Sequence, residues 1–353
     1  MGKKDNMLAA LKKELMLRKN EMGNKTVETI YFGGGTPSVL ELDEIESLLD
    51  TVYTNFTITE NPEITLEANP DDLSISKIKQ LSKSLVNRLS IGVQSFFDED
   101  LQLMNRAHTA SEVVSVLEEA TQYFDNISID LIYGVPNMSS ERWRQNIQKA
   151  LEYNLCHISS YALTVEPKTA LESFIKKGKI KPLDDAVAQE HHEILVNELK
   201  NAGYINYEIS NFGKPNYFSK NNTAYWLGKS YLGIGPSAHS FDGKSRSWNI
   251  NNNLKYIKAI EKNQLPSEIE ILSTTDRYNE YIMTGLRTIW GVSLKKVKED
   301  FGDNYLAHLI KQSQHKIEKA LLVIENNTLL VTAKGKFLSD GIAADLFLIN
   351  LED

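Results

Sequence analysis

The chain repeats one local pattern, in which a short apolar run is followed by a turn and a longer amphipathic segment. Several runs are almost continuously apolar, as in parallel strands that are covered on both faces. The expected strands are residues 27–32, 63–66, 88–93, 127–132, 157–163 and, with a weaker signal, 204–209. The expected helices are residues 6–20, 42–53, 75–84, 110–123, 141–153 and 184–201. This alternation predicts an α/β fold: a parallel barrel, a part-barrel or an open doubly wound sheet.

The composition narrows the class of protein. A length of 353 residues suggests about two domains, or one barrel with an appendage. Apolar residues make up 41% and charged residues 24%, which is typical of a globular protein. No apolar stretch is long enough to span a membrane, and no signal peptide is expected at the start, so we expect a cytoplasmic protein. The net charge of −8 argues against nucleic-acid binding.

The character of the chain changes after about residue 210, where Gly, Asn and aromatic residues become frequent. The last sixty or so residues read as two helices, a hairpin that turns at Asn326 and Asn327, and a final helix. We therefore expect a barrel-like core at residues 1–245 and a small winged-helix-like domain at residues 246–353. The charge favours packing of this domain against the barrel over nucleic-acid binding.

Three glycines, Gly33 to Gly35, end the first expected strand and precede Thr36 and Pro37. Glycines at a strand end let a ligand approach the backbone closely, although a plain tight turn explains such a run equally well. The spacing matches neither the P-loop nor GxGxxG, so an ordinary nucleotide-phosphate loop is not expected.

Polar residues fall near the ends of the next three strands, at Glu67, Gln94 and Asp130. Each alone suits a turn or cap, but polar groups on consecutive strand ends are typical of a site at the carboxyl rim of a barrel. Arg106 follows a short helix, where it either complements the helix dipole or pairs with a ligand carboxylate.

The other chemically distinctive residues have ordinary interpretations. His108 is expected to be structural, and the adjacent His191 and His192 are expected on a helix surface. Cys156, the single cysteine, is expected to be a small buried apolar group, and it excludes an internal disulfide. Ser139 and Asp184 are expected to cap helices.

Aromatic residues at 217–226 lead into a Gly-rich stretch at 231–240. Such stretches are usually core and loops, and they also suit a pocket for a flat apolar ligand such as a porphyrin. Further motifs lie at residues 32–37, 67–70, 92–96, 106–108, 130–136, 161–169, 225–226 and 233–239. Together, over nearly the whole chain, they resemble the radical S-adenosylmethionine family of oxygen-independent coproporphyrinogen III oxidase-like proteins. The similarity is closest to the HemW-type haem chaperone branch.

The resemblance implies an open (β/α)6 part TIM barrel with a small helical, winged-helix-like C-terminal domain. In this family a [4Fe-4S] cluster reduces S-adenosylmethionine to methionine and a 5′-deoxyadenosyl radical. Three functions are considered: a HemW-like haem chaperone that passes haem to an acceptor protein, a coproporphyrinogen III oxidase that converts propionates to vinyls, and a cluster-free non-catalytic barrel. Haem or a porphyrinogen is the implied ligand, and no oligomeric state is indicated.

The resemblance also implies which residues bind the cofactor. Gly34, Gly35 and Thr36 would hold the methionine end of S-adenosylmethionine, and Glu67 would add a contact. The adjoining cofactor or substrate region would be lined by Gln94, Arg106, Asp130 and Ala162, and the backbone of His239 would lie near the adenine.

Two departures from the family pattern matter. The cluster motif CxxxCxxC belongs after a first strand, upstream of the helix at Asn6, and neither that strand nor the motif is present. We expect this polypeptide to be catalytically silent, and we favour a truncated sequence or misassigned start over a natural cluster-free form.

The second departure concerns the chaperone motif HNxxYW. Here Asn221 stands in place of its histidine, and Asn is a poor ligand for haem iron. Another group would have to ligate the iron.

Overall fold

The computed structural model describes residues 3–167 and 169–349. The chain divides into two compact units. We call residues 29–42 and 62–219 the sheet unit, and residues 1–28, 43–61 and 220–353 the terminal unit. The sequence-based division at residues 245 and 246 stays a prediction.

Most of the sheet unit is built on one seven-stranded sheet in the order β1-β2-β3-β4-β5-β7-β6. The strands are β1 (Val27–Phe32), β2 (Ile58–Ala68), β3 (Arg88–Gln94), β4 (Ile127–Tyr133), β5 (His157–Ala162), β6 (Ile205–Asn206) and β7 (Asn211–Gly213). Strands β2 to β5 pair in parallel. All seven residues of β3 are buried, which explains why these runs are nearly continuously apolar.

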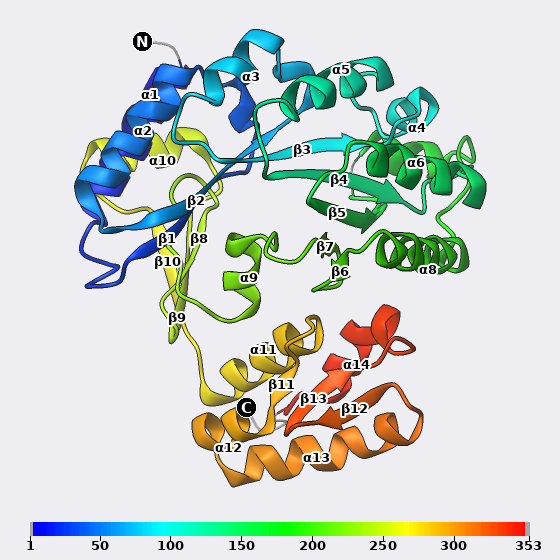
Figure 1. Ribbon diagram of the computed structural model, residues 1–353. Helices are drawn as coiled ribbons and strands as arrows, with labels where there is room; N and C mark the ends of the chain where they lie inside the picture. Colours follow the sequence, from blue (N-terminus) through cyan, green and yellow to red (C-terminus); the bar gives the residue numbers. More distant parts are fainter. Residues whose placement is uncertain (1–2, 168, 350–353) are drawn as a thin grey trace. The chain divides into compact units, whose positions relative to one another are not determined.

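Helices connect the parallel strands, and α3 and α5 pack together alongside them (Figure 1). The helices are α3 (Ile75–Leu81), α4 (Asp98–Leu103), α5 (Ala110–Ala120), α6 (Ser140–Glu152), α7 (Ala170–Lys176) and α8 (Asp185–Asn201), with short 3₁₀ turns η1 (Pro37–Val39) and η2 (Pro70–Asp72). Ser139 and Asp184 accept hydrogen bonds from the first turns of α6 and α8, so both predicted caps are confirmed. The predicted parallel, barrel-like α/β fold is confirmed.

The weakest strand prediction, residues 204–209, was wrong in detail. The chain makes two very short strands there, and β7 pairs antiparallel with both β5 and β6. The carboxylate of Glu208 accepts hydrogen bonds from the Ser210 amide and the Asn211 side chain. These bonds stabilise a tight reversal of the chain between β6 and β7. The strand next to β5 is therefore the antiparallel β7 and not the sixth parallel strand that the sequence suggested.

The terminal unit contains helices from both ends of the chain and a three-stranded antiparallel sheet in the order β10-β9-β8. Its first elements are α1 (Lys3–Leu17), α2 (Leu42–Asn55), α9 (Lys220–Trp226), β8 (His239–Phe241), β9 (Ser245–Asn249), α10 (Asn253–Glu261) and β10 (Ser267–Ile271). Helices α1 and α10 pack against each other. The sequence did not predict this sheet, because its strands are short and rich in Ser and Asn.

The C-terminal part of the terminal unit has its own apolar core, which includes Tyr278, Ile282 and Leu329. Its elements are α11 (Thr274–Leu286), β11 (Val292–Ser293), α12 (Leu294–Phe301), α13 (Asp303–Glu318), β12 (Leu322–Glu325), β13 (Thr328–Val331), η3 (Lys336–Leu338) and α14 (Ser339–Asp345). Asn326 and Asn327 both have positive φ, as a two-residue type I′ hairpin requires, so the predicted hairpin is confirmed. Among the described residues, no helix has the length and hydropathy to cross a membrane.

The histidine pair on α8 differs from its prediction. His191 and His192 are 0% and 5% exposed, not on the surface. The indole of Trp143 donates to the carbonyl of His191 at 2.8 Å, and the Gly134 amide donates to its Nδ1 at 3.2 Å. The helix therefore buries a more polar face than its sequence suggests.

Two other predictions for single residues are confirmed. His108 is buried, as expected of a structural residue, and the thiol of Cys156 is buried as well.

Candidate functional site

The glycine-rich loop after β1 forms one wall of the candidate site. Gly34 and Gly35 have φ values of 75° and 66°, which favour glycine, and a β-carbon on either residue would meet no atom within 4 Å. The loop therefore presents open backbone on its exposed side. A ligand can approach its peptide groups without steric hindrance.

Glu67, near the end of β2, joins this loop to the sheet. Its Oε2 accepts a hydrogen bond from the Gly34 amide at 3.2 Å, and its Oε1 accepts one from the Tyr31 hydroxyl at 2.7 Å. Burial raises the pKa of Tyr31, and the neighbouring Glu67 carboxylate raises it further. Tyr31 thus stays a neutral donor that orients Glu67 toward the loop.

Ser38 ties the glycine-rich loop to the next strand–helix connection. Its hydroxyl donates to Asp72 at 2.6 Å and accepts from the Asn69 amide at 3.3 Å, and its carbonyl accepts from the Lys77 side chain. Ser38 is fully buried, so these bonds are shielded from water. The loops that follow β1 and β2 are therefore held as one piece.

Gln94 ends β3 in a left-handed conformation, with φ 65°, where the register of β3 against β4 shifts. A β-carbon added to Gly92 would lie 2.8 Å from the side-chain Nε2 of Gln94 and 3.7 Å from the side-chain Oδ1 of Asn69. The side chain of Gln94 thus folds back over Gly92 toward the end of β2. A larger residue at position 92 would require the end of the Gln94 side chain to move.

Asp130 lies within β4, directly opposite Ser159 of β5, and the Ser159 hydroxyl hydrogen-bonds to it. Desolvation raises the pKa of Asp130 from 3.8 to about 6. The charge of Glu67 acts in the same direction, and Ser159, Arg88 and Arg106 oppose it. The interactions of Asp130 with Glu67 and Arg106 bring three of the predicted site residues into one electrostatic group.

Arg106 supplies positive charge to this group. Partial desolvation lowers its pKa, and attraction to Asp130 counteracts the lowering. Ala162 ends β5 opposite Tyr133 and is exposed. These two residues, together with Gly34, Gly35, Thr36, Glu67, Gln94 and Asp130, belong to the sheet unit, whereas His239 lies in the terminal unit.

Sequence reasoning missed Tyr31 and Ser159, which hold Glu67 and Asp130. Tyr31 lies two residues before the first glycine, and Ser159 lies in β5 next to Ser160. Nothing in the residue pattern singles out either side chain from its polar neighbours. Their partners follow from strand pairing and loop geometry, which the sequence pattern does not specify.

The candidate site does not fit a metal cluster. Within residues 3–167 and 169–349, no three His, Cys, Asp or Glu residues are grouped so that they could hold a metal ion. A [4Fe-4S] cluster needs several thiolates, and the sequence contains one cysteine. Cys156 precedes β5, at the amino end of the parallel strands, and its thiol hydrogen-bonds to the Asp125 carbonyl at 3.2 Å. Glu67, Gln94 and Ala162 lie at or next to the opposite, carboxyl ends of β2, β3 and β5.

Comparison with known proteins identifies the family. Residues 5–150 match the Radical SAM superfamily, and residues 272–338 match the HemN C-terminal domain. A protein from Bacillus subtilis (strain 168) named heme chaperone HemW is 33% identical over 344 residues, 96% of this chain and 90% of the relative. The chain is a HemN/HemW-like radical S-adenosylmethionine protein.

Other members of this HemN/HemW-like group agree in sequence and fold. The heme chaperone HemW of Lactococcus lactis subsp. lactis (strain IL1403) is 35% identical over 90% of this chain and 83% of the relative. The structure of coproporphyrinogen III oxidase (HemN) from Escherichia coli superposes with a TM-score of 0.84, covering 97% of this chain and 83% of that one. It is 23% identical, so this likeness concerns the fold.

Proposed function

We propose that this chain is a HemW-like protein that binds S-adenosylmethionine at the carboxyl ends of its parallel strands and binds haem for delivery to an acceptor protein in the cytoplasm. The hydrogen bond from the Gly34 amide to Glu67 is the observation that supports binding of S-adenosylmethionine. It places an open backbone loop beside a carboxylate that no described lysine or arginine neutralises by an ion pair. That combination suits a small zwitterionic ligand with a sulfonium centre.

The charges of the site complement such a ligand. S-adenosylmethionine carries an ammonium group, a carboxylate and a sulfonium. Glu67 and Asp130 would attract the positive groups, Arg106 would pair with the carboxylate, and the loop at Gly34, Gly35 and Thr36 would bind the methionine end through its peptide groups. Gln94 and Ala162 would line the adjoining wall.

In this family the bound cofactor, reduced at a [4Fe-4S] cluster, supplies a 5′-deoxyadenosyl radical. The described residues do not fit that cluster, so no radical step is assigned to this chain. The proposal for this chain concerns binding, in which Glu67 and Arg106 orient the ligand and Tyr31 keeps Glu67 in place.

Haem is supported by the relatives, which are named heme chaperones and match the chain almost from end to end. The alternative, decarboxylation of coproporphyrinogen III, requires the radical. The third alternative, a barrel that binds neither ligand, predicts no binding of S-adenosylmethionine and no binding of haem.

Two titrations test the proposal. Calorimetry should detect S-adenosylmethionine binding that weakens in Glu67→Gln, and ferric haem should give a shifted Soret band. A chain that binds neither ligand would be the non-catalytic barrel. A chain that binds no haem but forms vinyl groups from coproporphyrinogen III would be the oxidase.

A further inference from the structure

Strand β10 forms one edge of the antiparallel sheet in the terminal unit, where it pairs with β9 alone. The carbonyl of Pro266, just before β10, accepts a hydrogen bond from the Ile250 amide. The amide of Leu272, just after β10, donates one to the Lys244 carbonyl. Because hydrogen-bonded pairs alternate along an antiparallel ladder, the even-numbered residues of β10 bond to β9. The peptide groups of its odd-numbered residues therefore point away from the sheet.

These outward peptide groups belong to Ser267, Ile269 and Ile271. None of them makes a hydrogen bond to another residue in the described part of the chain. A sheet edge of this kind is a template for a further strand, whose backbone would supply the partners.

Two large apolar side chains lie uncovered on this edge. Ile269 and Ile271 are 68% and 76% exposed. They share the sheet face of Asn249, which hydrogen-bonds to Glu14 of α1, but they lie further along the strand from that contact. A partner strand would remove both side chains from water, which favours its binding.

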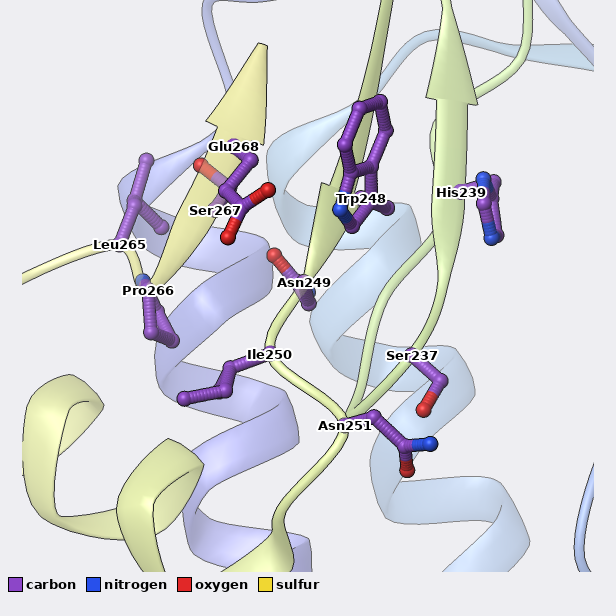
Figure 2. Close-up of a pocket in the computed structure, with 10 residues that line it drawn as sticks. All are labelled: Ser237, His239, Trp248, Asn249, Ile250, Asn251, Leu265, Pro266, Ser267 and Glu268. Atoms are coloured by element: carbon purple, nitrogen blue, oxygen red, sulfur yellow. The ribbon is translucent and has the colours of Figure 1, made fainter.

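The other face of β10 is acidic. Glu268 lies opposite Trp248, and Figure 2 shows both side chains at the pocket that they help to line. Glu270 lies opposite Arg246, but Arg246 already forms an ion pair with Glu280 of α11 at 2.5 Å. Desolvation raises the pKa of Glu280, and the negative charge of Glu270 contributes to the rise. Three carboxylates thus surround one guanidinium, and this face keeps an excess of negative charge.

The charge pattern distinguishes between possible partners. If two copies of β10 paired antiparallel in full overlap about Ile269, Glu268 of one copy would face Glu270 of the other. Like charges directly opposite each other destabilise a strand pair. A strand with lysine or arginine at alternate positions would place a cation opposite each carboxylate instead. Apolar residues at its remaining positions would cover the exposed isoleucines.

We propose that β10 binds an extended segment of a partner protein by strand addition, and that this segment alternates basic and apolar residues. Main-chain hydrogen bonds to the odd-numbered residues provide affinity, and the two faces of β10 provide specificity. The inference goes beyond the proposed function, because none of these residues belongs to the candidate site. Its test needs neither S-adenosylmethionine nor haem.

A synthetic peptide of alternating lysine and valine, about seven residues long and blocked at both ends, serves as the probe for the full chain. Fluorescence anisotropy of the labelled peptide should detect binding that weakens as salt is raised from about 0.05 M to about 0.3 M. Hydrogen exchange should show that the amides of Ile269 and Ile271 become protected when the peptide binds. The amides of Glu268 and Glu270, already bonded to β9, should change little. A peptide of alternating glutamate and valine should not bind.

Variants separate the backbone contribution from the charge. Ile269→Pro removes an outward amide but no hydrogen bond to β9, so the sheet should form while peptide affinity falls at least about tenfold. Ile269→Val keeps the amide and should bind like the wild type. Glu270→Lys should weaken binding, whereas Glu325→Lys makes the same charge change at an exposed residue of β12 and should not.

Three outcomes would overturn the proposal. The first is a wild-type chain that does not bind the basic peptide. The second is unchanged affinity in Ile269→Pro, with the fold verified by circular dichroism. If that variant does not fold, unchanged affinity in Glu270→Lys or unprotected amides at Ile269 and Ile271 would have the same meaning. The third is a wild-type dimer, seen by light scattering, that Ile269→Pro dissociates, because the edge would then bind a second copy of this chain.

Discussion

Glu14, in the last turn of α1, forms an ion pair with Arg18, the residue just after the helix, with Nη1 of Arg18 3.2 Å from Oε1 of Glu14. Their side chains are 0% and 6% exposed. Tyr256 also donates to Glu14, at 2.5 Å. The pair therefore fills the space between α1, α10 and the segment that leads to β8 with charge-assisted hydrogen bonds.

Removal of one partner of this pair should be costly. Glu14→Ala removes a buried carboxylate that pairs with Arg18 and also accepts hydrogen bonds from Asn249 and Tyr256, so several buried donors lose their acceptor. It should lower the free energy of unfolding by about 3–5 kcal/mol, measured by urea denaturation. Glu21→Gln is the control, because Glu21 is 43% exposed and its bond to Arg18 should be worth less than about 1 kcal/mol. Equal losses in the two variants would contradict this account of Glu14.

The carboxylate of Glu67 should be needed for S-adenosylmethionine binding. Glu67→Gln keeps the size of the side chain but removes its charge, and we expect the dissociation constant from calorimetry to rise about tenfold or more. Tyr31→Phe removes one hydrogen bond to Glu67 and should have a smaller effect. An unchanged affinity in Glu67→Gln would show that the ligand does not contact this carboxylate.

Asp130 should make stability depend on pH. Its pKa is raised from 3.8 to about 6, so the folded state binds the proton more tightly than the unfolded state. The stability linked to that proton is fully present below pH about 3.8 and is lost as the pH rises through about 6. Relative to wild type, Asp130→Asn should therefore gain about 2 kcal/mol between about pH 4 and pH 7.5.

Urea titrations at the two pH values measure this difference. Asp50→Asn, on the exposed side of α2, is the matched control and should follow the wild type at both. A constant difference between Asp130→Asn and wild type would show that the Asp130 carboxyl does not titrate in this range.

Asn221→His restores the histidine of the chaperone motif. Because imidazole is a strong ligand for haem iron and an amide is a poor one, we expect ferric haem affinity to rise about tenfold and the Soret band to shift to that of an imidazole-ligated iron. Asn222→His, the neighbouring position on α9, is the control. If both variants resemble the wild type, bound haem does not lie within reach of position 221.

Much of the sheet unit was predictable, because parallel strands buried on both faces leave continuous apolar runs in the sequence. The runs at β3 and β4 and the helices after them were located within a few residues. The sheet of β8, β9 and β10 was not predictable. Its strands owe their formation to pairing and to contacts with α1, and short Ser- and Asn-rich segments carry little intrinsic strand preference.

The site was predictable as a set of positions, but not as a set of contacts. Glu67 and Asp130 stood out as polar residues in apolar runs near strand ends. The hydrogen bond that Tyr31 gives Glu67 depends on where neighbouring strands meet in space. The surroundings of His191 likewise depend on another helix, because the indole of Trp143 in α6 donates a hydrogen bond to the His191 carbonyl.

The sequence alone determined the order of strands and helices, the glycine-rich loop, the family and the shortage of thiolates. These depend on local pattern, backbone preference and residue counts, which are properties of the chain itself. Tertiary structure decided that Glu14 is buried, that desolvation raises the pKa of Asp130, and that the rings of His239 and Trp248 lie side by side. Burial, electrostatic environment and cross-strand neighbours arise from residues far apart in the chain, because desolvation and charge act through space.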